Sequence, residues 1–259
     1  MRIATWNVNS LRARLEIVMD WLTQDGPDVV CLQETKVTDD LFPIEVLATA
    51  GYQAVFTGQK TYNGVAILSR LPLTDVMLAL PDAPGEDEKR FIAATVAGVR
   101  VINVYVPNGQ EVGSSKFYYK LAWLERLRTY LAATYTLNDA LLLCGDFNVA
   151  PEPRDVYDAA KVDGEILFHP EERAAFARLL AWGLRDTLRL HHADGGLYSW
   201  WDYRAAAFRR NLGFRIDHIL VTPLVAARCT AVTLEQQLRR LPKPSDHIPV
   251  VATFGDSSV

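Results

Sequence analysis

Short apolar runs rich in β-forming residues recur along the chain, and many of them arrive in pairs. Residues 51–57 and 63–69 form one such pair, and 90–106 contains two strand-like runs around Gly98, which is typical of a hairpin. Other strand-like runs cover 2–6, 28–34, 140–146, 214–221 and 247–254. Helical spacing of apolar residues predicts helices after Ser10, over 116–135 and over 171–182. Because helices and strands do not strictly alternate, we expect an α/β fold, a four-layered sandwich of two mostly antiparallel β-sheets flanked by helices, and not a doubly wound sheet.

Length and composition are compatible with one large unit. The chain has 259 residues, of which 49% are hydrophobic and 22% charged, so it can fill a sizeable core. No repeat of solenoid length and no low-complexity linker divides it. We therefore expect a single domain over 1–254, followed by a short tail at 255–259.

Cysteine usage and hydropathy predict the cellular compartment of the protein. Cys31, Cys144 and Cys229 are odd in number, and two of them lie inside apolar runs, which is typical of buried thiols in a reducing environment. The N-terminus turns polar within a few residues, so no signal peptide is expected. No apolar run approaches the roughly 20 residues of a membrane span. These features predict a soluble, cytoplasmic protein with no membrane partner.

The charge balance argues against nucleic acid as a partner without excluding it. With 27 Lys and Arg against 31 Asp and Glu, the formal net charge is −4, so no global basic field indicates nucleic acid. A metal ion and a local basic patch could still supply the positive charge that such a partner needs.

Polar side chains stand where six of the apolar runs end or begin. In chain order they are Asn7, Glu34, Tyr105, Asp146 with Asn148, Asp217, and Asp246 with His247. A strand end is a rigid mount, and the loops at one rim of a sandwich can bring such groups together. The alternation of side chains along a strand places Asp146 and Asn148 on the same face.

Carboxylates crowded at one place repel each other unless a cation neutralises them. Oxygen ligands without a cysteine cluster favour Mg²⁺ or Mn²⁺ over zinc. Mg²⁺ that shares its shell with water and phosphate oxygens is the usual arrangement for phosphoryl transfer, with an Asp and a His beside the attacking water. The pattern therefore predicts a metal-dependent site for phosphate chemistry.

Each residue also has a purely structural alternative. Asn7 could form a turn, Glu34 could cap a loop, and Tyr105 could be a core aromatic. Asp217 could pair with an arginine, and Asp246 could begin a turn. Stability alone does not require so many ionisable groups at strand ends, and this favours a site. Three further histidines are expected to be partly exposed and without a role: His191, His192 and His218.

Six motifs carry a resemblance to a known family. They are WNVNSLR (6–12), CLQETK (31–36), YVPNG (105–109), GDFNVAP (145–151), FRIDHIL (214–220) and SDHIPV (245–250). In order and spacing, the chain resembles the exonuclease III family of DNA-repair nucleases, within the endonuclease/exonuclease/phosphatase superfamily, from Met1 to about Phe254. GDFN and SDH are shared by the wider superfamily, whereas LQETK, WDYR, GFRID and KPSDH favour the DNA-repair branch. The stretch 161–197 carries no motif matched to catalysis.

The resemblance implies the four-layered fold and a Mg²⁺-dependent hydrolase, with Mn²⁺ as an alternative ion and one or two ions bound. It implies an apurinic/apyrimidinic endonuclease that cuts the phosphodiester 5′ to abasic sites in double-stranded DNA. Digestion of duplex ends from 3′ to 5′ and removal of blocked 3′ termini accompany that activity in the family. Nothing in the sequence demands more than a monomer.

The resemblance also implies which residues lie at the metal. Glu34 would be the principal ligand. The full set at or near the cation is Asn7, Glu34, Asp146, Asn148, Asp246 and His247.

Catalytic roles follow from the same motifs. Asp146 would orient or deprotonate the attacking water, and Asn148 would hold a phosphate oxygen or position Asp146. Tyr105 would assist at the scissile phosphate. His247, oriented by Asp217, would contact the phosphate and stabilise its charge. Whether Asp146 or His247 is the general base stays open at this point.

The segment 198–217 combines aromatic residues with arginines. Trp200, Phe214 and Ile216 match the family positions that line an apolar pocket for a flipped-out abasic sugar, whereas Trp201 is expected to be core. Basic residues predicted to contact the DNA backbone form two groups. The first is Arg204, Arg209, Arg210, Arg239, Arg240 and Lys243, and the second is Lys60, Arg90, Lys116 and Lys120.

Other functions remain as alternatives. An inositol-polyphosphate phosphatase, a sphingomyelinase or a secreted DNase would share GDFN and SDH. A secreted DNase would usually carry a signal peptide and a disulfide, and a lipid-directed enzyme would expose a membrane-facing stretch. A catalytically silent DNA-binding protein would lack at least one of Glu34, Asp146, Asn148 or His247, and all four are present.

Overall fold

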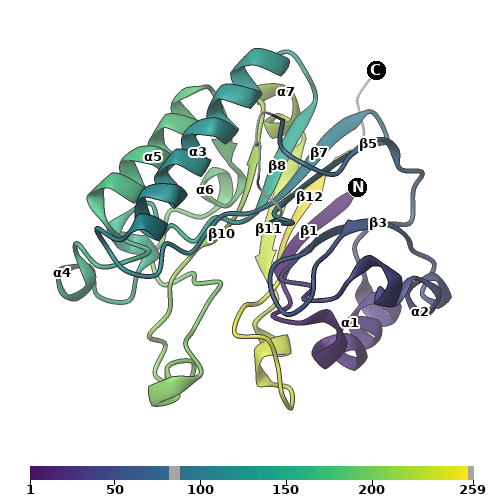
Figure 1. Ribbon diagram of the computed structural model, residues 1–259, viewed down its shortest axis with the longest axis horizontal. Helices are drawn as coiled ribbons and strands as arrows, with labels where there is room; N and C mark the ends of the chain where they lie inside the picture. The colour runs from purple at the N-terminus through teal and green to yellow at the C-terminus, as the bar shows by residue number, and fades with distance from the viewer. Residues whose placement is uncertain (82–87, 256–259) are drawn as a thin grey trace.

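The computed structural model describes residues 1–81 and 88–255, and within them two six-stranded sheets pack face to face (Figure 1). The first sheet has the order β11 (Cys229–Leu234), β12 (Val250–Phe254), β1 (Arg2–Asn7), β2 (Val29–Gln33), β4 (Val65–Ser69) and β3 (Gln53–Thr57). The second has the order β5 (Thr74–Met77), β6 (Phe91–Val96), β7 (Val99–Tyr105), β8 (Leu141–Asp146), β10 (Asp217–Val221) and β9 (Arg185–Asp186). Each sheet contains one parallel pair, β1 with β2 and β7 with β8, and the other described neighbours are antiparallel.

Helices cover the two outer faces and complete the predicted four layers (Figure 1). On the first sheet lie α1 (Leu11–Asp25) and α2 (Ile44–Thr49), and on the second α3 (Ser115–Thr134) and α5 (Pro170–Ala181). The shorter helices are α4 (Ala159–Val162), α6 (Thr187–His191) and α7 (Pro223–Ala226). Short 3₁₀ helices are η1 (Asp39–Leu41), η2 (Pro153–Asp155), η3 (Arg204–Ala206) and η4 (Gln236–Arg240).

The sequence explains where the two longest helices begin. The Ser10 hydroxyl accepts the backbone N–H of Ala13, and the Ser114 hydroxyl accepts that of Phe117, so each serine caps its helix. The Leu124, Leu127 and Leu131 side chains of α3 are buried against the outer face of the second sheet. These helices therefore start at their caps and stay bound through apolar stripes, as the spacing predicts.

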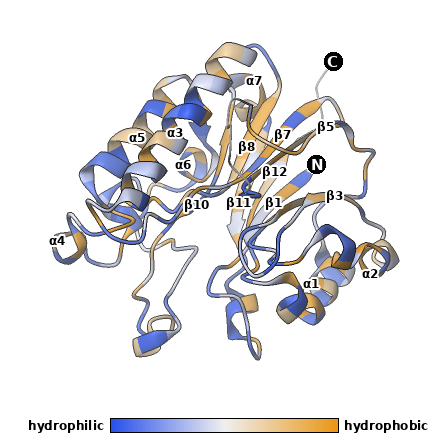
Figure 2. Cartoon of the chain, in the orientation of Figure 1, coloured by the Kyte–Doolittle hydropathy of each residue, from blue (hydrophilic) through white to orange (hydrophobic). Residues whose placement is uncertain are grey.

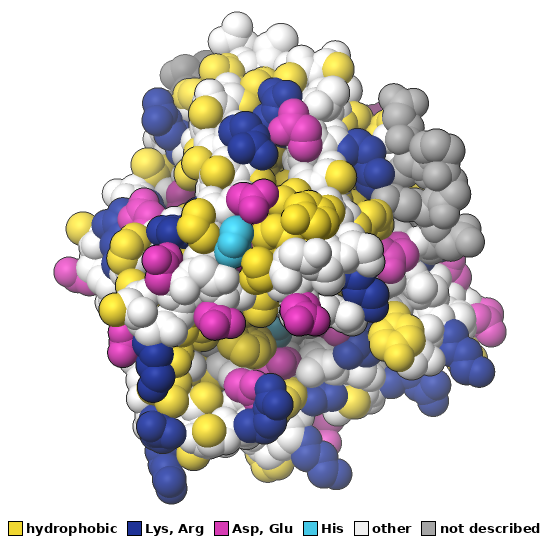
Figure 3. All heavy atoms as spheres, turned by 60° about the vertical axis from the view of Figure 1, so that its left-hand side comes forward, with side chains coloured by type: hydrophobic (Ala, Val, Ile, Leu, Met, Phe, Trp, Pro, Cys, Tyr) yellow, Lys and Arg dark blue, Asp and Glu magenta, His cyan; other side chains and the backbone are white. Residues whose placement is uncertain are grey.

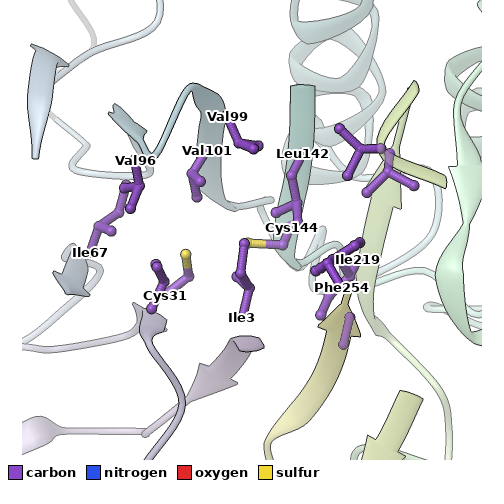
Figure 4. Packing of buried hydrophobic residues seen from close by; sticks show 14 of the residues in the cluster. Ile3, Cys31, Ile67, Val96, Val99, Val101, Leu142, Cys144, Ile219 and Phe254 are labelled. Atoms are coloured by element: carbon purple, nitrogen blue, oxygen red, sulfur yellow. The ribbon is translucent and has the colours of Figure 1, made fainter. Parts of the chain in front are cut away.

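Apolar side chains fill the space between the sheets. Figure 2 shows the hydrophobic residues concentrated along the strands, and Figure 4 shows part of the cluster, in which Ile3 and Cys31 of the first sheet pack with Val101 and Cys144 of the second. The three cysteines are free, with Cys31 and Cys144 fully buried, which agrees with the prediction of unpaired thiols. Burial raises the pKa of the Cys31 thiol well above its usual range.

Several elements were not predicted. The strand β9 has only two residues, and β5 and β11 lie at or near sheet edges with mostly exposed side chains, so they lack the alternation of a half-buried strand. The strands predicted at 214–221 and 247–254 begin only at Asp217 and Val250, because the preceding residues form isolated bridges. The predicted tail at 255–259 lies outside the described residues except for Gly255. None of the helices in the described residues has the length and apolar character needed to span a membrane.

Candidate active site

The parallel strand pairs bring the predicted polar residues to one rim. In the first sheet the register sets Asn7 of β1 opposite Gln33 of β2, so Glu34 follows at the same edge. In the second sheet Asp146 of β8 is paired with Tyr105 of β7 on one side and with Asp217 of β10 on the other. Strand ends from both sheets therefore meet at a single edge of the sandwich.

Direct side-chain contacts join the strand ends of the two sheets at this rim. The Asn7 side-chain amide donates to Glu34 Oε1 at 2.8 Å and to Asp146 Oδ2 at 2.9 Å, and Asn7 is fully buried. Ligand atoms of Glu34, Asp146 and His247 all lie within 4.8 Å of one another, the arrangement expected around a metal ion. Oxygen atoms dominate this set, which fits a hard divalent cation.

His247 is held by a buried carboxylate. Its Nδ1 lies 2.9 Å from Asp217 Oδ2, and its Nε2 lies 3.8 Å from Asp146 Oδ2. Burial opposes a charge on the ring, but the carboxylates of Asp217 and Asp146 outweigh it and raise the pKa of His247 to about 10. At neutral pH the imidazole is therefore a cation whose two N–H groups face these carboxylates.

Asp146 is a carboxylate with no exposed surface. Burial, together with the nearby Asp217 and Glu34 charges, raises its pKa to about 7, even though His247 and the Asn7 hydrogen bond act in the other direction. A divalent cation beside it would favour the ionised form. Asp146 therefore has a pKa near neutrality without a cation, and beside a cation it would be ionised and able to accept a proton.

Asn148 follows Asp146 in a left-handed backbone conformation, with φ of 51°. Its backbone N–H donates to Asp146 Oδ1 at 2.9 Å, and this hydrogen bond fixes the orientation of the carboxylate. Its side-chain amide donates to Val106 O at 3.0 Å, and its Oδ1 accepts from Asn108 Nδ2 at 3.0 Å. One hydrogen of the Asn148 amide remains available to a ligand.

Tyr105 lies beside the carboxylates, and burial followed by the charges of Glu34 and Asp146 raises its pKa well above the usual range, so its hydroxyl keeps its proton. The Arg90 guanidinium stacks on its ring, 4.7 Å from the ring centroid, and is paired with Glu88 at 2.7 Å. Tyr105, Arg90 and Lys116 line a hollow of about 510 Å³ next to the rim.

Asp246 lies next to the site but, among the described residues, outside the tight group of Glu34, Asp146 and His247 that could hold a metal ion. Its Oδ1 accepts from Asn9 Nδ2 at 2.9 Å, and its Oδ2 accepts from Trp200 Nε1 at 3.0 Å. Burial opposes its charge, but His247 and these hydrogen bonds together lower the pKa of Asp246. It is therefore an ionised carboxylate that ties the loop before β12 to the rim.

The aromatic segment packs directly against His247. The ring centroid of Trp200 lies 6.4 Å from that of His247 and 5.6 Å from that of Phe214. Trp200, Phe214 and Ile216 belong to one apolar cluster, in which Ile216 is almost fully buried, and Trp201 is core as predicted. Arg204 lies on an exposed loop, with 88% of its side-chain surface accessible, and pairs with Asp202 at 2.7 Å.

Two expectations were wrong. Lys120 was expected to contact DNA, but it is fully buried and paired with Glu172 of α5, because α3 turns this position towards α5 and the loop after β8. His218 was expected to be partly exposed, but it is 1% exposed, because it alternates with Asp217 on β10 and points to the opposite face of the sheet. Both residues contact the loop that carries Asn148.

Sequence reasoning missed two residues at the rim. Lys36 Nζ lies 2.7 Å from Glu34 Oε2 and donates to Asn9 Oδ1 at 2.6 Å, which links Glu34 to Asn9 and so to Asp246. Burial opposes the Glu34 charge, but Lys36 and Asn7 together lower the pKa of this carboxyl. The available signal was the presence of both residues inside the quoted motifs WNVNSLR and CLQETK.

Comparisons with known proteins agree on one protein family for this chain. The model of the Endonuclease/Exonuclease/phosphatase family matches residues 4–247. The chain is similar to exodeoxyribonuclease III of Haemophilus influenzae, with 35% identity over 266 residues that cover 98% of this chain and 100% of the relative.

Two solved structures are similar over nearly the whole chain. An AP endonuclease from Archaeoglobus fulgidus shares 45% identity and a TM-score of 0.95, covering 99% of this chain and 100% of the other. The 3′ phosphatase NExo from Neisseria, bound to a product DNA hairpin, shares 47% identity and a TM-score of 0.96 at the same coverage. These likenesses confirm the predicted fold.

Proposed function

Because the chain belongs to the exonuclease III family, within the endonuclease/exonuclease/phosphatase family, we propose that it is a Mg²⁺-dependent DNA-repair nuclease. It cleaves the phosphodiester 5′ to abasic sites in double-stranded DNA and also processes 3′ ends. The observation that carries this proposal is the convergence of Glu34, Asp146 and His247 within 4.8 Å at a rim built from both sheets.

The donor set supports a magnesium ion. Glu34 and Asp146 would hold the cation, with Asn7 and Asp246 supporting them and with His247 and Asn148 close by. When bound, the ion supplies positive charge to phosphate oxygens and acidifies a water molecule. Mn²⁺, which takes the same oxygen ligands, is the alternative ion.

The protein's own groups have distinct tasks in this proposal. Asp146, a fully buried carboxylate that a bound cation would keep ionised, orients and deprotonates the attacking water. His247 remains a cation and stabilises the charge that develops on the phosphoryl oxygens, and Asp217 fixes its ring. This division follows because His247 carries a proton on each ring nitrogen at neutral pH and so cannot accept another. Tyr105 and the Asn148 amide contribute neutral hydrogen-bond donors to the same phosphate.

Double-stranded DNA is the proposed partner. The wall of Trp200 and Phe214 beside His247 would receive an abasic sugar turned out of the helix, which is easiest to extrude because it has no base to unstack. Arg90 and Lys116 line the hollow next to Tyr105 and would contact the backbone on one side of the site. Arg90 already holds Tyr105, so only part of its guanidinium is available to a phosphate.

Loops beyond the rim would contact the backbone on the other side. Two loops extend below the sheets in Figure 1, and Lys and Arg side chains gather along the same lower edge in Figure 3. The exposed basic residues of these loops are Arg204, Arg209, Arg210, Arg240 and Lys243. Their charge offsets the negative net charge of the chain where DNA would lie.

Cleaning of 3′ ends is the second activity we propose, since one structural relative is named a 3′ phosphatase and was solved with a product DNA hairpin. A 3′-phosphate presents the same phosphoryl group to the same rim. The single domain over 1–254, the monomeric state and the cytoplasmic location stay predictions from the sequence.

One assay tests the proposal. A duplex with a single synthetic abasic site is incubated with Mg²⁺ beside a recessed 3′ end, a 3′-phosphate and an inositol phosphate. We expect incision 5′ to the abasic site, loss of all cleavage with EDTA, and restoration by Mg²⁺. The Glu34→Gln variant is the matched inactive control. Absence of cleavage with Mg²⁺ and with Mn²⁺ would refute the nuclease, and turnover of the inositol phosphate alone would favour a different branch of the family.

A further inference from the structure

The loop after β8 presents two consecutive backbone carbonyls to buried side chains that the proposed chemistry does not use. Lys120 Nζ donates to Asn148 O at 2.6 Å, and His218 Nε2 lies 2.8 Å from Val149 O. Asn148 has a positive φ and lies beyond the end of β8, so no strand ladder satisfies its carbonyl. A buried carbonyl in such a position needs a side-chain donor.

Lys120 reaches this loop from the second turn of α3 and has no exposed surface. Its three N–H donors are all used, on Asn148 O, on Asn108 O at 3.1 Å, and on the carboxylate of Glu172. The other Glu172 oxygen accepts the backbone N–H of His169 at 3.1 Å and thereby caps α5. One ammonium group therefore ties α3, α5 and two site loops together.

The two residues that Lys120 holds also meet through their side chains. Asn108 Nδ2 donates to Asn148 Oδ1 at 3.0 Å, while the Asn148 N–H donates to Asp146 Oδ1 at 2.9 Å. A displacement of Asn148 would consequently move both the free amide hydrogen of Asn148 and the carboxylate of Asp146. The Lys120 contact therefore controls two groups at the rim without touching a substrate.

His218 holds the next carbonyl of the loop, that of Val149, in the same way. Its Nδ1 lies 2.9 Å from an Arg215 guanidinium nitrogen, which can only donate, so the ring proton lies on Nε2 and is donated to Val149 O. Arg215 is in turn fixed by Asp155 and Asp186 at 2.6 and 2.7 Å. Burial, followed by the Arg215 charge, lowers the pKa of His218 to about 4, which keeps the ring neutral.

Stability alone does not explain the buried ion pair of Lys120 and Glu172. Well-packed apolar residues in place of a buried ion pair are often neutral or stabilising. The distinctive property of Lys120 and His218 is where their hydrogens point, since each serves a carbonyl of the loop that carries Asn148.

We propose that Lys120 and His218 are positioning residues for the nuclease reaction, which hold the 147–150 loop so that Asn148 and Asp146 keep their working orientation. The inference rests on the proposed function for its kinetic consequence, but its structural consequence can be measured without DNA.

The first experiment removes the Lys120 donor and keeps the volume. In the double variant Lys120→Met with Glu172→Gln, neither a charge nor an unpaired carboxylate stays buried. We expect kcat on the abasic duplex to fall by about 10- to 100-fold while KM changes by less than about threefold, because loss of orientation acts on the chemical step. Leu127→Ala, on the same buried face of α3, is the control: it destabilises the core without removing a hydrogen bond to the loop, and kcat should be unchanged in the folded variant.

The second experiment tests His218 by rescue. His218→Leu removes the donor to Val149 O, whereas His218→Gln retains an N–H donor and an acceptor for Arg215. We expect the Leu variant to lose kcat and the Gln variant to recover most of it at equal thermal stability. This pair decides the inference if the Lys120 double variant does not fold.

Hydrogen exchange of the Asn148 N–H gives a readout independent of activity. We expect exchange at least tenfold faster in the Lys120 double variant than in Leu127→Ala, because the bond to Asp146 loosens. Folded variants with wild-type kcat and unchanged Asn148 exchange would overturn the inference. If the wild-type enzyme does not cut DNA, the proposed function fails, and the exchange data alone decide the positioning role.

Discussion

Asp217→Asn isolates the electrostatic role of one carboxylate. The Asp217 Oδ2 atom lies 2.9 Å from His247 Nδ1, and Asp217 is the strongest of the groups that raise the His247 pKa to about 10. Asparagine has the same shape, and its carbonyl oxygen can still accept the Nδ1–H. The substitution therefore removes the charge and leaves the hydrogen bond in place.

The size of the effect follows from the geometry. A rise in the pKa of His247 from 6.5 to about 10 favours the imidazolium by about 5 kcal/mol. Two unit charges about 4 Å apart interact by about 4 kcal/mol at an effective dielectric constant near 20. Asp217 thus accounts for most of the effect, and its neutralisation should return the pKa of His247 to about 7, with Asp146 still present.

Two measurements check this value. NMR of the labelled His247 imidazole should give a midpoint near pH 10 in the wild type and near pH 7 in the variant. At pH 8 only about a tenth of the variant rings would then be charged, so kcat should fall at least about tenfold and recover in part towards pH 6. A His247 midpoint that stays above about 9, or an unchanged pH–rate profile, would refute the electrostatic reasoning.

The same shift predicts the pH dependence of stability. A histidine whose pKa is raised in the folded state stabilises that state fully below pH 6.5, and this contribution is lost as pH rises towards about 10. The variant should therefore unfold at lower urea concentration than the wild type at pH 6, and the difference should vanish above about pH 10. A constant difference across this range would contradict the assignment.

Two further changes probe other parts of the molecule. Glu34→Gln removes a carboxylate from the metal-ligand group, so Mg²⁺ affinity measured by calorimetry should fall at least about tenfold, while circular dichroism stays unchanged. Arg215→Leu leaves the buried carboxylates of Asp155 and Asp186 without their shared partner, and should lower the free energy of unfolding in urea by about 3–5 kcal/mol. Arg204→Ala, on an exposed loop, is the control and should leave the urea midpoint unchanged.

The order of apolar runs determined the main architecture. Strands that arrive in pairs cannot all be joined by crossover helices, so two mostly antiparallel sheets with helices outside follow from chain order. The hairpin at Gly98 and the helices beginning after Ser10 and Ser114 follow from local backbone chemistry. Edge strands such as β11 did not follow, because backbone pairing with β12 holds them and their side chains need not alternate.

The choice of site residues could also be predicted in large part. Polar residues at strand ends are visible in the sequence, since alternation and strand length are local properties. That they share one rim depends on the register of β1 with β2 and of β7 with β8, which sets Asn7 beside Glu34 and Tyr105 beside Asp146. Register between distant strands is a property of the packed sheets.

Only the tertiary structure decided which charged residues face the open rim and which are buried inside the protein. Lys116 and Lys120 lie one helical turn apart on α3, yet the first lines the hollow at the rim and the second is buried on the loop of Asn148. The packing of α3 against α5 brings Glu172 to Lys120, so a residue from a stretch without a catalytic motif completes the support of the site. A lysine carries the same charge at either position, and the direction in which the helix turns it determines whether that charge meets solvent or a buried carboxylate.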